Sequence, residues 1–120
     1  MSEIIYQNKI KNMGESVEAF GGEMIILFGD AAPDTLKDFC YTVDVVDTNA
    51  PIKEGQILKI DENEYKILAV GEIAERNLTS LGHLTVNFSG DVSGLLPGAI
   101  VVEKKENPGL KIGTEIAIIA

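Results

Sequence analysis

The sequence contains few of the residues that build redox or metal sites. It has one cysteine, Cys40, one histidine, His83, and no tryptophan. A single cysteine excludes an internal disulfide, and one cysteine with one histidine excludes a zinc site of the usual Cys/His type within one chain. We therefore expect a chain suited to a reducing compartment, with no metal and no other cofactor.

Positive charge and long hydrophobic runs are also scarce. Ten Lys and Arg residues stand against nineteen Asp and Glu, so the formal net charge is −9. Such a surface is repelled by nucleic acid and by anionic membranes, whereas it attracts a basic protein partner. No apolar run approaches the about 20 residues that a membrane helix needs, and the N-terminus lacks the features of a signal peptide. These absences predict a cytoplasmic protein that neither binds nucleic acid nor inserts directly into a membrane.

The chain consists mainly of short apolar segments separated by glycine and polar turns. Its 120 residues, 45% of them hydrophobic, predict a single domain over residues 1–120. Strands are expected at residues 4–10, 24–28, 41–46, 55–61, 64–70, 83–88, 98–103 and 113–118, and short helices at 32–40 and 72–81. The prediction is a mainly β fold, namely a small closed or nearly closed β-barrel with one or two short helices.

The helix expected at residues 72–81 leads directly to the histidine. Its spacing places Ala74, Leu78 and Leu81 on one face, and Gly82 can adopt the positive φ that ends a helix. Period two then separates the following residues into two faces. Leu84, Val86 and Phe88 form the apolar face, while His83, Thr85 and Asn87 form the polar one.

A histidine on the polar face of a strand can act as a nucleophile through an unprotonated ring nitrogen. Beyond such a nucleophile, phosphoryl transfer mainly requires in-line geometry and hydrogen-bond donors for the phosphoryl oxygens. Candidates to supply these donors are Thr79, Ser80, Thr85, Asn87, nearby backbone amides and the charged side chain of Arg76. No second histidine is present, so the group that orients the ring is a carboxylate, a hydroxyl, an amide or a backbone carbonyl, and the sequence does not choose among Glu72, Glu75 and Asn87. Cys40 is a rival acceptor, although a lone cysteine in an apolar setting is more often a small buried residue.

Residues 69–88 resemble the glucitol/sorbitol-specific IIA component of the phosphoenolpyruvate-dependent sugar phosphotransferase system. The most specific part is Asn77-Leu78 followed by Leu81-Gly82-His83, with Thr85 and Phe88. Ile5-Tyr6-Gln7, residues 24–28 with Ala32-Pro33, and Pro97-Gly98 match in the same order, so the similarity spans most of the chain.

The resemblance implies a β-barrel phosphocarrier with phosphotransferase activity. His83 would accept the phosphoryl group from phospho-HPr, the donor. It would then pass the group to a cysteine of the IIB component, which works with the IIC membrane transporter in the uptake of glucitol, sorbitol or a related polyol. The alternative is a non-catalytic β-barrel interaction or regulatory module of the same family.

Overall fold

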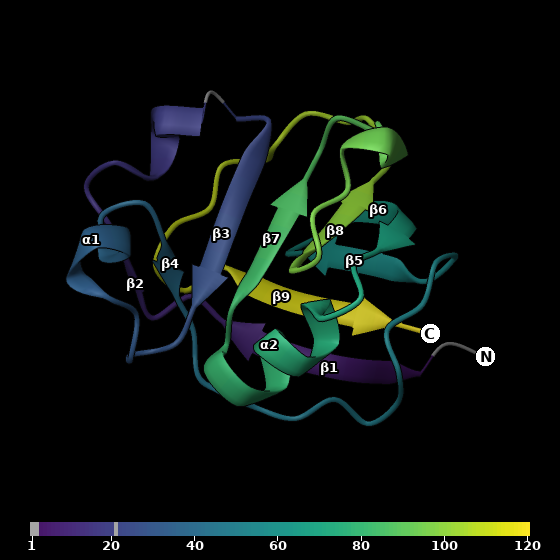
Figure 1. Cartoon of the computed structure of the whole chain (residues 1–120), viewed down its shortest axis with the longest axis horizontal. Helices are drawn as coiled ribbons and strands as arrows, with labels where there is room; N and C mark the ends of the chain where they lie inside the picture. Colours follow the sequence, from purple (N-terminus) through teal and green to yellow (C-terminus); the bar gives the residue numbers. More distant parts are fainter. Residues whose placement is uncertain (1–2, 21) are drawn as a thin grey trace.

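The computed structural model describes residues 3–20 and 22–120, which form one curled nine-stranded sheet with short helices around it (Figure 1). The strands are β1 (Ile4–Lys9), β2 (Asn12–Met13), β3 (Met24–Phe28), β4 (Tyr41–Thr42), β5 (Ile57–Ile60), β6 (Asn63–Val70), β7 (Leu84–Asn87), β8 (Ala99–Val102) and β9 (Glu115–Ile119). The helices are α1 (Asp34–Lys37) and α2 (Ala74–Leu81), with 3-10 turns η1 (Val17–Phe20) and η2 (Val92–Gly94).

The sheet curls because the two strands at its opposite edges, β1 and β2, follow one another directly in the chain. The strand order is β1-β9-β5-β6-β8-β7-β3-β4-β2, so the consecutive strands β1 and β2 stand at opposite ends. Between them, the N–H of Ile10 bonds to the carbonyl of Thr114, and the N–H of Lys11 bonds to the carbonyl of Thr42. The chain thus passes from one end of the sheet to the other, which gives the nearly closed barrel predicted from the sequence.

The interior of the curl is filled by the apolar residues of alternating strand positions. Leu84 and Val86 of β7 point inward, opposite Leu27 and Ile25 of β3, and all four are almost completely buried. Ile100 of the neighbouring strand β8 and Leu78 of α2 belong to the same core. The predicted alternation on β7 is therefore confirmed, and it leaves His83, Thr85 and Asn87 on the outer face.

Two elements are shorter than the sequence predicts. The helix expected at residues 32–40 is the single turn α1, which buries no residue and leaves Leu36 41% exposed. The strand expected at 41–46 ends at Thr42, because its parallel partner β3 ends at Phe28 and the ladder then has nothing to pair with. Residues 43–56, which we call the strap, instead run across the end of the barrel toward β5 (Figure 1).

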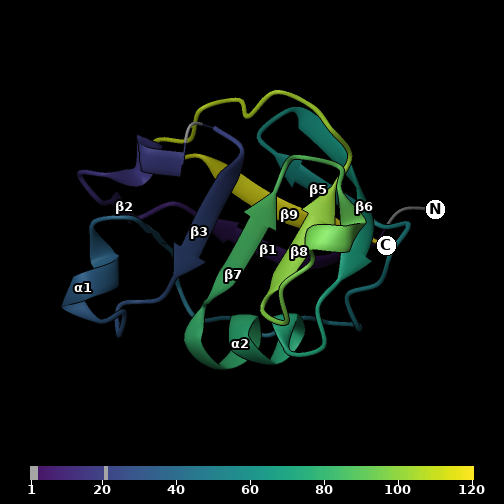
Figure 2. The same ribbon diagram turned by 45° about the horizontal axis from the view of Figure 1, so that its top comes forward.

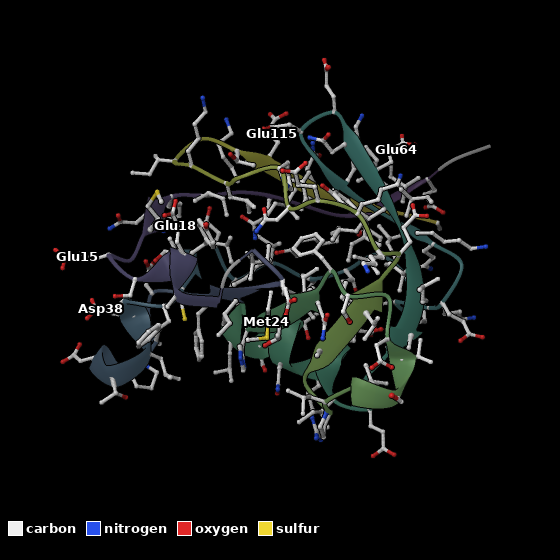
Figure 3. All side chains as sticks on the ribbon, turned by 90° about the horizontal axis from the view of Figure 1, so that it is seen from above. Glu15, Glu18, Met24, Asp38, Glu64 and Glu115 are labelled. Atoms are coloured by element: carbon white, nitrogen blue, oxygen red, sulfur yellow. The ribbon has the colours of Figure 1, made fainter. Side chains whose placement is uncertain are left out.

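Acidic side chains are spread over the molecule. Glu15, Asp38, Glu64 and Glu115 are exposed, and Figure 3 shows Glu15 and Asp38 together at the left of the body, with Glu64 and Glu115 along its upper side. The negative net charge is therefore a general property of the surface. Among the described residues, no helix has the length and the apolar character needed to cross a membrane.

Candidate functional site

His83 lies at the junction where α2 ends and β7 begins, close to the end of β3 (Figures 1 and 2). Gly82 ends the helix in the left-handed conformation, with φ of 72°, and its N–H bonds to the carbonyl of Leu78 at 3.0 Å. The next N–H, that of His83, bonds to the carbonyl of Asn77 at 3.1 Å. The helix end therefore fixes the backbone of the histidine before the strand starts.

Two glycines allow the backbone of this junction to pack closely against the end of β3. The N–H of Gly29 bonds to the carbonyl of Leu81 at 2.9 Å. A Cβ on Gly29 would lie 2.6 Å from that carbonyl oxygen, and a Cβ on Gly82 would lie 2.9 Å from the nitrogen of Gly29. Both positions thus need glycine for close backbone approach. The sequence predicted that Leu81 shares one helix face with Ala74 and Leu78. This prediction is wrong for Leu81, which is 42% exposed, whereas Ala74 and Leu78 are buried.

The rest of α2 is anchored as well. At its start, the N–H of Ile73 bonds to the carbonyl of Pro97 at 3.0 Å, and Gly71 packs so closely that a Cβ there would lie 2.2 Å from the same oxygen. In its first turn, Oε1 of Glu75 accepts the N–H of Ile52 in the strap at 2.8 Å. Glu75 therefore connects the strap to the helix. This contact gives no support to the sequence-based hypothesis that Glu75 orients the imidazole.

The imidazole of His83 stacks on the ring of Phe28. The ring centroids are 4.6 Å apart and the planes differ by 18°. The residue is half-buried, and neither ring nitrogen has a hydrogen-bond partner within residues 3–20 and 22–120. Since every completely buried side-chain nitrogen or oxygen in that part of the chain has a partner, neither ring nitrogen is completely buried. Phe28 contacts the face of the ring, and this contact occupies neither nitrogen.

Burial against Phe28 and its surroundings lowers the pKa of His83 below the ordinary value of 6.5. The neutral ring, which carries a free lone pair, is then the main form at neutral pH. We expect an NMR titration of the imidazole protons to give a midpoint below that of an unstructured peptide of residues 77–88. Because the folded chain binds fewer protons than the unfolded one, the contribution of His83 to stability is lost as the pH falls below about 6.5. A midpoint equal to or above that of the peptide contradicts this.

Cys40 also packs with Phe28, the residue that contacts the imidazole. It forms a small cluster with Phe28 and Ala32, is only 2% exposed, and has its pKa raised by burial. A buried thiol with a raised pKa is a poor nucleophile, because the thiolate is the reactive form. Cys40 therefore fits the small buried residue that its apolar setting suggests.

The structure separates the donors suggested by the sequence. Thr85 shares the outer face of β7 with His83 and is half-buried. The hydroxyls of Thr79 and Ser80 instead donate to the carbonyl of Arg76, at 3.3 and 2.5 Å. Asn87 lies about 13 Å further along the strand. Its Oδ1 accepts the N–H of Ser89, so it serves a turn at the opposite end of β7.

Arg76 and Glu72 are exposed, and no contact in the structure links either side chain to the imidazole. Sequence reasoning missed Phe28 and Gly29 as parts of the site. Residues 24–28 read only as an apolar strand, and the pairing of β3 with β7 cannot be deduced from either segment alone. The signal that was present is Gly29 itself, directly after the run, where a backbone contact needs the space of a missing side chain.

Comparison with known proteins identifies the family. Residues 5–117 match the family model described as the PTS system glucitol/sorbitol-specific IIA component. The PTS system glucitol/sorbitol-specific EIIA components of Escherichia coli (strain K12) and Shigella flexneri are each 32% identical over 100 residues, which cover 82% of this chain and 81% of the relative. The crystal structure of a PTS system IIA component from Enterococcus faecalis V583 superposes with a TM-score of 0.81 and 31% identity, covering 92% of this chain and 97% of that one. This chain thus belongs to the glucitol/sorbitol-specific IIA family of the sugar phosphotransferase system.

Proposed function

We propose that this protein carries a phosphoryl group on His83, which it receives from phospho-HPr and passes to the cysteine of a IIB component during uptake of glucitol, sorbitol or a related polyol. Membership of the family supports a phosphocarrier role with phosphotransferase activity. The observation that carries the assignment to His83 is its imidazole, which stacks on Phe28 while both nitrogens have no partner in the described residues and neither is completely buried.

The chemistry asks for a neutral imidazole, and the lowered pKa of His83 keeps the ring in that form. The lone pair of the unprotonated nitrogen attacks phosphorus, a new N–P bond forms, and the N–P bond to the donor histidine breaks with its electron pair returning to that ring. In the second step, a thiolate of the acceptor attacks the same phosphorus. An S–P bond forms, the N–P bond to His83 breaks, and the lone pair returns to His83, so the carrier ends unchanged.

Stacking on Phe28 suits a carrier that must meet two proteins in turn. The contact uses the face of the imidazole, so it restricts rotation of the side chain without occupying either nitrogen. A rigid ring approaches the phosphorus in one orientation, which removes part of the entropic cost of reaching in-line geometry. The anchors of α2 at Gly71, Glu75 and Gly82 extend that rigidity to the backbone.

The proposal is tested by reconstituting the relay. We expect the purified protein, incubated with enzyme I, HPr and phosphoenolpyruvate, to gain one acid-labile phosphoryl group by intact mass. The group should disappear when a IIB component is added and should reappear on that protein. Omitting HPr is the control for donor dependence. Absence of an adduct while HPr itself becomes phosphorylated rejects the carrier function and favours a non-catalytic binding module of the same family.

A further inference from the structure

A phosphoryl group carries negatively charged oxygens, and donors must face them for transfer to be fast. Two of the donors that the sequence suggested are internal to α2, and a third serves a turn at the far end of β7. Other donors for these oxygens would have to be polar side chains at the junction that the fold does not use. Within the described residues, two half-buried ones make no side-chain hydrogen bond, the amide of Asn77 and the hydroxyl of Thr85. Because no completely buried polar atom there lacks a partner, neither group is completely buried.

Asn77 and Thr85 meet at the same short segment of backbone. Nδ2 of Asn77 lies 3.2 Å from where a Cβ on Gly98 would stand. The carbonyl of Gly98 in turn accepts the N–H of Thr85 at 3.3 Å. Gly98 therefore leaves room for the amide beside the start of β8, next to the strand that carries Thr85. Any side chain at position 98 would crowd that amide.

Asn77 and Thr85 are also both connected to His83 through the backbone. The carbonyl of Asn77 accepts the N–H of His83 at 3.1 Å, so the helix end fixes the two residues relative to each other. Thr85 follows His83 by two positions, which places both on the outer face of the sheet, about 7 Å apart along the strand. Two donors without a partner in the described residues thus lie on the two elements that adjoin the histidine, Asn77 on α2 and Thr85 on β7.

We propose that the Asn77 amide and the Thr85 hydroxyl hold the phosphoryl oxygens during transfer to and from His83. This inference rests on the phosphocarrier function proposed above and adds the residues that bind the transferred group. As the donor's N–P bond breaks and the bond to His83 forms, the phosphorus keeps its three equatorial oxygens, and two of these accept hydrogen bonds from Asn77 and Thr85. The donors lose no proton and form no covalent bond.

Neutral donors suit a group that must be passed on. Hydrogen bonds from charged groups are about twice as strong as neutral ones, so a lysine or arginine at this position would hold the phosphoryl group more firmly. Lys11, which lies near the end of β3, is already paired with Asp30 and Asp44 at 3.0 and 2.9 Å. Hydrogen bonds from an amide and a hydroxyl lower the activation barrier of phosphoryl transfer. They are weak enough that the carrier can still release the phosphoryl group in the next step.

The first test replaces Asn77 with aspartate, which keeps the shape and converts a donor into a repelling carboxylate. We expect the rate of phosphoryl acceptance from phospho-HPr to fall about 100-fold, the scale of losing one such donor. Asn107→Asp is the matched control, since it adds the same charge in the loop beside Phe88, at the opposite end of β7. Thermal melts of both variants check folding. Equal rates for Asn77→Asp and wild type overturn this inference and leave the carrier function standing, whereas a wild type that accepts no phosphoryl group overturns both.

The second test uses Thr85 and a readout that a purely structural role would not change. Thr85→Val should slow acceptance at least about 10-fold and Thr85→Ser should restore it, with Thr42→Val on β4 as the matched control. In the phosphorylated protein, ³¹P NMR titration should show a higher phosphoryl pKa for Thr85→Val than for wild type, because a donor to the dianion has been removed. An unchanged phosphoryl pKa together with an unchanged rate contradicts the role of Thr85, even if Asn77→Asp fails to fold.

Discussion

Replacing His83 with glutamine is expected to abolish phosphoryl acceptance, with a loss of about a thousand-fold or more. Glutamine keeps a planar polar group on the outer face of β7, but it has no nitrogen lone pair that can form the N–P bond. The measurement is intact mass after incubation with enzyme I, HPr and phosphoenolpyruvate. Cys40→Ser is the control that should still gain the group, because the buried thiol takes no part.

The same variant separates chemistry from stability. The side chain of His83 contributes one ring stack and no side-chain hydrogen bond to the described residues, so the free energy of unfolding should fall by only about 1 kcal/mol. An adduct that persists on His83→Gln, and is lost from Cys40→Ser, reverses the assignment of the two acceptors. A stability loss on the scale of a core truncation shows that the ring is part of the main core.

Gly29→Ala is expected to damage both the fold and the transfer reaction. A methyl group at this position would lie 2.6 Å from the carbonyl oxygen of Leu81 and 2.8 Å from a methyl carbon of Val45. The carbonyl of Leu81 cannot move freely because it is backbone at the end of α2, whereas the methyl group belongs to the half-exposed side chain of Val45 in the strap. We expect a loss of about 1–3 kcal/mol in the free energy of unfolding, as for other overpacked sites, with slower phosphoryl acceptance because β3 and the helix end are pushed apart.

Gly94→Ala in η2 is the matched control for this substitution. Nothing lies within 4 Å of a Cβ at Gly94, and its φ is in the ordinary range, so its stability should remain close to that of the wild type. Chemical denaturation of the two variants, together with the initial rate of phosphoryl acceptance, measures both effects. If Gly29→Ala is as stable and as active as Gly94→Ala, the close contact between β3 and Gly82 does not hold the site together.

The site depends on a helix that is fixed at three points. Gly71 and Ile73 hold its start to Pro97, Glu75 ties its first turn to the strap, and Gly82 packs its end against Gly29. His83 and Asn77 are both attached to this helix, while Thr85 and Phe28 belong to paired strands. For the proposed transfer through His83, such rigidity would raise the rate, because little ordering remains to be done at each encounter with a partner.

The sequence alone determined those features that local pattern controls. Strict alternation from His83 to Phe88 placed the histidine outside the core, because successive side chains of a strand point to opposite faces. Gly82 was identified as the helix end for its access to positive φ, and the motif around His83 pointed to the family. These inferences use residues within a few positions of one another, so no knowledge of the fold was needed.

Tertiary structure decided which distant segments meet at the histidine. The pairing of β3 with β7 brought Phe28 under the imidazole and Gly29 against Gly82, and the packing of α2 on residues 96–98 brought the Asn77 amide to Gly98. It also showed that the hydroxyls of Thr79 and Ser80 donate to the carbonyl of Arg76, because helical geometry lets a hydroxyl bond to the carbonyl three or four residues earlier. Such contacts join segments far apart in the chain, and register is set by the packing of the whole barrel, which no short stretch of sequence specifies.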